Sequence, residues 1–452
     1  MTFLHRSALN HLNSWRKSTN RQPLLISGAR QVGKTNLVRH FGALNFGQIH
    51  EFNFEESRSL HKIFAGDLSP TELIRGLTLA TDKTIDVGRD LVFFDEIQAC
   101  PSALNSLKYF SEKMPNLAII AAGSLLGLHL SEGSFPVGKV DRLTLFPLTF
   151  SEYVSATMSD VLNGEWSDAK RTRVVSSFLH EKLWSCFLDY LIVGGMPAAV
   201  MDFKYVSGGN ENIRNKYEAA RRRQHLIAKD YVADIAKHSG KINARHIEGV
   251  WNQIPIQLSR VMDGSSKRFQ FKDVLSGLNS FRDLAGPIDW LVKAGLVIKV
   301  PICHAANSPL SAFTSENLFK LYLFDTGILG CLLDLKPSII RDYEFGTFKG
   351  FFVENFVAQE LVGAPHASSV YCWTEAKAEI EFLIQCQDGV MPIEVKSGSR
   401  IRSRSVSSFL ERYAPNQSVI LSGRMPNSTT KIVGESRTQL LSLPIYFAGE
   451  LW

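Results

Sequence analysis

The chain has 452 residues, of which 45% are hydrophobic and 21% are charged. Because domains usually hold about 100 to 200 residues, we expect a folded globular protein with three or four domains. The net charge of +6, from 50 basic and 44 acidic residues, permits contact with nucleic acid but is too small for a dedicated polycationic binder. The six scattered cysteines contain no CxxC pair, so neither a zinc site nor a disulfide framework is indicated.

The apolar segments predict a cytoplasmic protein without a membrane partner. The first residues, Met-Thr-Phe-Leu-His-Arg-Ser, carry no apolar region of the kind that a secretory signal needs. The longest apolar stretches, 117–130 and 186–201, are interrupted by Gly, Ser, His or Asp. They therefore fall short of the roughly 18 to 20 apolar residues that a membrane-spanning helix requires.

The first 155 residues alternate between helical and strand patterns. Leu4, Ala8, Leu12 and Trp15 recur at helical spacing and predict a first helix. Short apolar runs that are typical of buried strands follow at 24–27, 48–54, 91–94, 117–122 and 142–146. Such alternation predicts a parallel sheet covered by helices, as the first domain, 1–155.

A complete phosphate-binding loop follows the first predicted strand and opens a helix that includes Asn36 to Phe41. In such a loop the glycines let backbone N–H groups surround a phosphate, the lysine neutralises phosphate oxygens and the threonine hydroxyl ligates Mg²⁺. A chance glycine turn is the alternative, and the flanking strand and helix disfavour it. The sequence therefore predicts ATP and Mg²⁺ as cofactors, with nucleotide-binding residues Gly28, Ala29, Arg30, Gln31, Val32, Gly33, Lys34 and Thr35.

An acidic pair ends the strand predicted at 91–94. Asp95 would stand at the carboxyl end of that strand, where it and Thr35 could hold Mg²⁺, and Glu96 would polarise the attacking water. A glutamate directly after the metal-binding aspartate is typical of the P-loop ATPases that have an extra strand between the two motifs. A solvated acidic strand end is the alternative.

Two further polar residues are candidates for the same site. Ser124 ends the strand predicted at 117–122, where its hydroxyl could sense the terminal phosphate or position water, or could instead cap the next helix. Arg142 begins the following strand and could serve a neighbouring subunit as an arginine finger, or could be a surface charge. A homo-oligomer is therefore a candidate assembly.

Beyond residue 155 the pattern changes twice. Strand signals vanish in 156–240, which we interpret as a helical lid. Residues 241–345 combine helices with two strands, Leu296 to Ile302 and Lys320 to Phe324, and this favours a winged-helix module. In the last domain, 346–452, we expect a helix at 348–362, strands at 369–374, 378–386 and 390–396, a helix near 403–414, and strands at 417–421 and 443–447.

The last domain contains a second polar constellation. Glu381 precedes a predicted hairpin turn at Gln387-Asp388-Gly389, and Glu394-Val395-Lys396 follows it. If 387 pairs with 390, then Glu381 lies opposite Lys396, and period two puts Glu381, Glu394 and Lys396 on one face.

Such a group could serve a metal-dependent phosphodiesterase, because carboxylates hold Mg²⁺ and a lysine orients water or stabilises the charged transition state. Glu381 and Glu394 would be the metal ligands, and Glu354 on the preceding helix could add another. Arg400, Arg402 and Arg404 follow closely enough to contact phosphates. From the residues alone, an ordinary edge hairpin with exposed Glu and Lys is an equally good interpretation.

Several motifs together resemble the bacterial and archaeal AAA-type ATPases whose C-terminal half is a restriction-endonuclease-like domain of uncharacterised function. They run from about residue 5 to residue 398, and besides the phosphate-binding loop they are Phe-Phe-Asp-Glu-Ile-Gln, Ala-Gly-Ser-Leu-Leu-Gly, Phe-Pro-Leu-Thr-Phe-Ser-Glu, Gly-Gly-Met-Pro, Leu-Tyr-Leu-Phe-Asp-Thr-Gly and Pro-Ile-Glu-Val-Lys-Ser. The resemblance implies an α/β fold class: a parallel-sheet ASCE-type ATPase core, a helical lid, a winged helix and a nuclease-like domain of the PD-(D/E)XK kind.

Two positions depart from that pattern. Glu381 stands where Asp is commoner, and its longer side chain shifts or weakens a metal site. Residues 137–141, Val-Gly-Lys-Val-Asp, stand where many members carry Gly-Arg, so the residue that would act in a neighbouring subunit is not identified.

The leading hypothesis is an ATPase that uses ATP to move or gate a C-terminal module acting on DNA or RNA, which it could cut. The alternative is a nucleotide-dependent binding switch whose nuclease-like fold recognises nucleic acid without cutting it. A third hypothesis is that the partner is a protein and that the winged helix is a spacer between domains.

Overall fold

The chain divides into two compact units in the computed structural model, residues 1–146 with 293–295 and residues 147–292 with 296–452. None of the helices that the structure describes is long and apolar enough to cross a lipid bilayer. The described residues are 3–130, 138–206, 212–260, 268–342, 348–364, 369–375, 378–397, 404–433 and 436–452.

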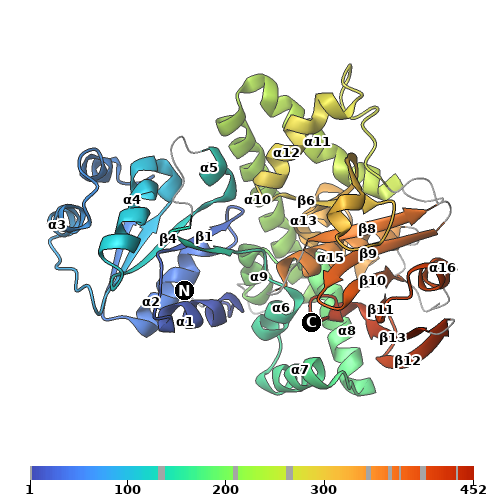
Figure 1. Cartoon of the computed structure of the whole chain (residues 1–452). Helices are drawn as coiled ribbons and strands as arrows, with labels where there is room; N and C mark the ends of the chain where they lie inside the picture. Colours follow the sequence, from blue (N-terminus) through green and yellow to red (C-terminus); the bar gives the residue numbers. More distant parts are fainter. Residues whose placement is uncertain are drawn as a thin grey trace. The chain divides into compact units, whose positions relative to one another are not determined.

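The N-terminal unit, drawn in blue to teal in Figure 1, is built on a parallel five-stranded sheet. The strand order is β2-β3-β4-β1-β5. This confirms the expected parallel α/β core. β4 lies between β1 and β3, so the extra strand predicted from the acidic pair is present. The strands are β1 (Leu24–Gly28), β2 (Ile49–Asn53), β3 (Leu91–Asp95), β4 (Ala118–Ser124) and β5 (Asp141–Thr144), and the helices are α1 (Ala8–Lys17), α2 (Lys34–Asn45), η1 (Arg58–Phe64), α3 (Pro70–Thr81), η2 (Ile97–Ala99), α4 (Pro101–Lys113) and α5 (Leu125–Leu130).

Helices cover both faces of this sheet because its central strands are apolar on both sides. Every residue of β3 and of β4 is buried. Val92 and Phe94 of β3 pack in one cluster with Leu104 and Leu107 of α4, whereas α2 packs against β1 to β4. A strand that is buried on both faces shows a continuous apolar run, which is why the sequence located these strands.

The first part of the C-terminal unit is helical. The described residues between 150 and 260 contain helices and no strand, as we expected for 156–240. The helices of this unit are α6 (Phe150–Thr157), α7 (Asp160–Thr172), α8 (Ser177–Val193), α9 (Pro197–Lys204), α10 (Ile213–Ser239), α11 (Lys241–Arg260), α12 (Phe281–Lys293), η3 (Leu310–Phe313), α13 (Thr326–Leu332), α14 (Pro337–Arg341), α15 (Phe348–Gly363), α16 (Arg404–Tyr413) and η4 (Ile445–Phe447).

An eight-stranded mixed sheet forms the rest of this unit, in the order β12-β13-β11-β10-β9-β8-β6-β7. The hairpin that suggested a wing is β6–β7, and β6 also pairs with β8, so one sheet crosses the predicted domain boundary at 345/346. The prediction of a strand at 443–447 is wrong in part, because β13 ends at Pro444 and residues 445–447 form the short helix η4. The strands are β6 (Val297–Cys303), β7 (Thr314–Leu323), β8 (Val370–Glu375), β9 (Ala378–Cys386), β10 (Gly389–Val395), β11 (Gln417–Ser422), β12 (Asn427–Val433) and β13 (Ser436–Pro444).

Asp325 joins two of the quoted motifs inside the C-terminal unit. Its buried carboxylate accepts hydrogen bonds from Gly195 N at 2.6 Å and from Ile328 N at 2.9 Å. A Cβ atom at Gly194 would lie 2.3 Å from Asp325 Oδ1, so the double glycine lets the backbone approach the carboxylate. These motif residues therefore link the segment that follows α8 to the start of α13.

A second buried carboxylate ties α15 to the first residue of α6. Glu360 Oε1 accepts a hydrogen bond from Phe150 N at 2.9 Å, and the Tyr190 hydroxyl lies 3.4 Å away and donates to Leu148 O at 2.5 Å. Burial raises the pKa of Glu360 to about 8. The carboxyl group is therefore mostly protonated in the folded protein at neutral pH.

We expect the free energy of unfolding of the C-terminal unit to fall as pH rises from about 5 to about 8. The folded state keeps the proton on Glu360 in this range, whereas the unfolded chain releases it near its ordinary pKa of about 4.3, so a rise in pH favours unfolding. Denaturant midpoints across this range measure the effect. Glu360→Gln should show a shallower pH dependence, and an identical slope in the variant would contradict the assignment.

Candidate nucleotide-binding site

The loop from Gly28 to Lys34 joins β1 to α2 in the geometry that a phosphate-binding loop needs. Gly33 has φ 95° and Gln31 has φ 62°, and left-handed values of this kind are typical of backbone turns that bind anions through their N–H groups. Gly28 is required for another reason: a Cβ atom there would lie 2.3 Å from the carbonyl oxygen of Leu145. The first glycine therefore permits close packing of the loop on the segment that follows β5.

Arg6 holds this loop from outside, and no role was predicted for it from the sequence. Its buried guanidinium donates from Nη1 to Val32 O at 2.8 Å and from Nη2 to Phe146 O at 2.6 Å. An arginine can bridge two carbonyls because its planar group offers several donors in fixed directions. The segment before α1 is therefore part of the loop's support.

Lys34 lies inside the loop. Its Nζ donates to Gly28 O at 3.1 Å and to Ala29 O at 2.8 Å, and the side chain is 7% exposed. Burial lowers the pKa of Lys34 to about 8, and the negative charges of Glu96 and Asp95 oppose this shift. Two neutral carbonyls compensate a buried ammonium only in part, so this cation favours an anionic ligand.

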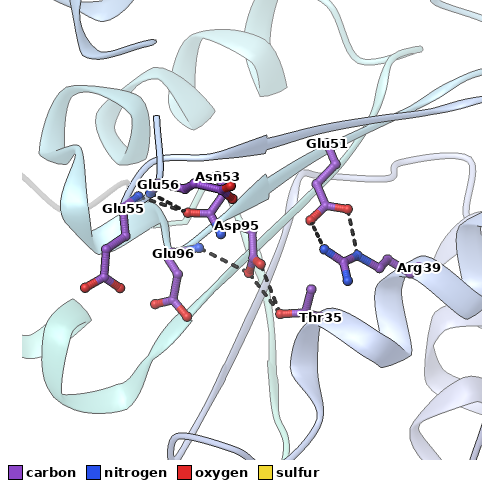
Figure 2. A network of polar contacts seen from close by, with 8 residues as sticks. All are labelled: Thr35, Arg39, Glu51, Asn53, Glu55, Glu56, Asp95 and Glu96. Carbon is purple, nitrogen blue, oxygen red and sulfur yellow. Dashed lines mark hydrogen bonds and ion pairs between the residues drawn. The ribbon is translucent and has the colours of Figure 1, made fainter. Parts of the chain in front are cut away.

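The two motifs meet at Thr35 and Asp95, as Figure 2 shows. The hydroxyl of Thr35 lies 3.0 Å from Asp95 Oδ2 and 3.3 Å from Oδ1, and Glu96 N donates to Asp95 Oδ1 at 3.1 Å. Burial raises the pKa of Asp95 to about 6, and the Thr35 hydrogen bond opposes the shift. A hydroxyl and a carboxylate are oxygen ligands of the kind that Mg²⁺ prefers, so this pair fits the expected ion.

The end of β2 adds polar groups that the sequence did not single out. Asn53 Oδ1 accepts hydrogen bonds from Glu55 N and Glu56 N, both at 3.0 Å. Arg39, one turn after Thr35 on α2, donates to both carboxylate oxygens of Glu51, at 2.8 and 2.6 Å (Figure 2). These contacts hold β2, the strand beside β3, in place. The signal in the sequence that could have identified them is the group of polar residues at the end of this strand.

Glu96 and Ser124 stand at the ends of neighbouring strands. Glu96 has φ 51° and is partly buried, and Gln98 Nε2 donates to Glu96 Oε2 at 2.5 Å. The buried Ser124 hydroxyl accepts a hydrogen bond from Gly127 N at 3.1 Å, which is a helix-capping contact. Arg142 is exposed on β5, and its role as an arginine finger stays a prediction.

The strands that carry Glu381 and Glu394 pair in a different register from the predicted one. Cys386 pairs with Gly389 and Phe382 with Ile393, so the turn consists of residues 387 and 388, and Glu394 rather than Lys396 follows in register with Glu381. The predicted pairing is therefore wrong by two residues, because Gly389 already belongs to the strand. A register shift of two residues leaves each side chain on the same face of the sheet. Glu381, Glu394 and Lys396 therefore still share one face.

Glu381 and Glu394 are both buried, at 5% and 1% exposure. Glu381 Oε2 accepts a hydrogen bond from Val395 N at 3.0 Å, and Lys396 Nζ forms an ion pair with Glu394 Oε1. Arg404 begins α16, whereas Arg400 and Arg402 lie outside the described residues. Their role as phosphate contacts stays a prediction.

Glu354 has its own partners on β7. Its Oε2 accepts a hydrogen bond from the Tyr322 hydroxyl at 3.1 Å and lies 3.8 Å from Lys320 Nζ, which also contacts Glu379 Oε1 at 2.5 Å. Within the described ranges, no three or more His, Cys, Asp or Glu side chains group as a metal site. The assignment of Glu354, Glu381 and Glu394 to a catalytic metal site stays a prediction.

Comparison with known proteins agrees with the geometry of the N-terminal unit. Residues 20–154 match a family model described as an AAA domain. Over these residues the N-terminal unit is therefore similar to AAA-type P-loop ATPase domains. Residues 186–339 and 349–446 match two models described as domains of unknown function, DUF8612 and DUF4143. No curated protein matches the chain.

Three solved structures are remotely similar to this chain. The Walker-type ATPase PABY2304 of Pyrococcus abyssi is 14% identical over 73% of this chain and 96% of that one, with a TM-score of 0.45. ORC1 of Aeropyrum pernix, solved in complex with DNA, is 14% identical over 74% and 93%, with a TM-score of 0.29. PCH-2 of C. elegans is 14% identical over 48% and 64%, with a TM-score of 0.27.

We expect the affinity for Mg·ATP to fall as pH rises above about 8. The pKa of Lys34 is about 8 in the free protein, and a bound triphosphate favours the charged lysine, so binding at higher pH requires proton uptake. The dissociation constant should then rise roughly tenfold per pH unit. Titrations with a fluorescent ATP analogue from pH 6.5 to 9.5 measure it, and calorimetry in buffers of different ionisation enthalpy counts the protons.

The control for this experiment is Lys108→Met, which removes an exposed lysine from α4. In this variant the affinity for Mg·ATP should depend on pH as it does in the unmodified chain. Lys34→Met should lose tight binding at every pH. An affinity that stays constant through pH 9 would show that the Lys34 ammonium does not gain a proton on binding.

Proposed function

We propose that this chain is a Mg²⁺-dependent ATPase whose nucleotide cycle moves or gates a C-terminal module that acts on nucleic acid. The observation that carries the ATPase half is the contact of Thr35 with Asp95 beside the buried Lys34. These three groups are the parts that bind a metal-complexed triphosphate.

The roles of the residues follow from their positions. The N–H groups of the loop would hold phosphate oxygens, and Lys34 would leave its two carbonyl partners to neutralise them. Thr35 and Asp95 would hold Mg²⁺, which supplies charge neutralisation on the transferred phosphate. Glu96, one residue beyond, would accept the proton of the attacking water.

We expect Glu96→Gln to bind ATP normally and to lose turnover by roughly 10²- to 10⁴-fold, the usual contribution of a general base. Lys34→Ala should lose binding and turnover together. Phosphate release and nucleotide affinity, measured separately, distinguish the two variants. Glu72→Gln, which changes an exposed carboxylate of α3, is the matched control, and full turnover in Glu96→Gln would refute the assignment of the base.

The nucleic-acid half of the proposal is supported by the polar group on β9 and β10. Two buried carboxylates beside a lysine are costly in an apolar interior unless a charged ligand uses them. A divalent metal between Glu381 and Glu394, with Lys396 nearby, would serve phosphodiester hydrolysis.

We expect any DNA or RNA cleavage by the purified protein to disappear in Glu394→Ala while ATP turnover remains. Single- and double-stranded DNA and RNA are incubated with and without ATP and Mg²⁺ or Mn²⁺, and strand integrity is read on gels. Glu411→Ala, an exposed carboxylate of α16, is the control. Cleavage that survives Glu394→Ala would refute the second site.

A binding switch without cleavage is the second candidate function. It is favoured by the contact of Lys396 with Glu394 and by the backbone hydrogen bond to Glu381, because both carboxylates already have protein partners. Calorimetric titration with Mn²⁺ separates the two: the switch has one ATP-dependent metal site, whereas the nuclease has a further site that Glu394→Ala removes.

A further inference from the structure

Gln98 occupies a position between the ends of two neighbouring strands. It belongs to η2, directly after β3, and its Nε2 donates to Glu96 Oε2 at 2.5 Å. The reverse orientation of the amide would bring its oxygen against the carboxylate, so this hydrogen bond fixes which end of the amide faces Glu96.

Two glycines of the next strand and helix make room for this side chain. A Cβ atom at Gly123 would lie 2.5 Å from Gln98 Oε1, and one at Gly127 would lie 2.3 Å from Gln98 Cγ. The Ser124 hydroxyl, which accepts the hydrogen bond from Gly127 N, lies between these glycines in the sequence. Gln98 therefore fills the space that the turn from β4 to α5 leaves beside Glu96.

The other end of the amide is not satisfied. Gln98 Oε1 is buried and has no hydrogen-bond partner among the described residues. A buried acceptor without a partner is destabilising. The orientation of the Gln98 amide is therefore set by its other contacts. Those contacts are the hydrogen bond to Glu96 and the packing against the turn.

We propose that Gln98 is a positioning residue for the hydrolytic water: it holds one carboxylate oxygen of Glu96 so that the other is available to that water. This inference rests on the proposed ATPase function. Gln98 would thus set the direction of the base without touching the nucleotide.

The test compares Gln98→Met with the unmodified chain. Methionine has a similar length and fills the space beside the glycines, but it cannot donate a hydrogen bond. We expect kcat to fall roughly tenfold, the effect of one lost hydrogen bond to a charged group, with an unchanged dissociation constant for ATP.

A role in packing alone would leave kcat unchanged in Gln98→Met, which keeps the packing, and would lower it only in Gln98→Ala. The positioning role predicts the same loss of kcat in both variants, because both lack the donor. If the unmodified chain turns over ATP and Glu96→Gln does not, but Gln98→Met retains the full rate, the positioning role is refuted and the ATPase proposal stands. If the unmodified chain binds ATP without hydrolysing it, the proposed hydrolysis is refuted, and the role of Gln98 with it.

Discussion

The hydrogen bond between Thr35 and Asp95 joins two motifs that lie sixty residues apart in the chain, and the nucleotide site depends on it. It forms because parallel strands end at one edge of a sheet, and because α2 packs over β1 to β4. β4 separates the two motif strands, so the end of β4 lies between them and brings Ser124 to the same edge. The strand order therefore sets which side chains can act together.

Much of this site could be predicted from sequence because its residues act through short, local patterns. The loop from Gly28 to Thr35 is contiguous, and the apolar run before Asp95 locates the end of a strand. Arg6 could not be found in this way, since it supports the loop by donating to backbone carbonyls, and a carbonyl is present at every position. Gln98 was visible in the sequence, but its role depends on the space left by the glycines of the next strand.

The C-terminal unit was harder to predict because its contacts are less local. The hairpin turn is one residue earlier than its Gly-containing sequence suggested, which moved the partner of Glu381 by two positions. β12 was not predicted, because it is a polar strand without an apolar pattern. Among the described strands it pairs with β13 alone, at the edge of the sheet. Glu354 is on the expected helix, but its partner Lys320 comes from β7, which the sequence assigned to another domain.

The contact between Arg6 and Val32 bears on how the nucleotide domain should be isolated. The AAA match begins at residue 20, and a shortened version that starts there would lack Arg6 as well as the buried Leu12 and Trp15 of α1. Its loop sequence would be complete, yet Val32 O would lose its arginine donor and part of the apolar cover would be missing. A fragment intended to report on ATP binding should therefore retain the segment that precedes α1.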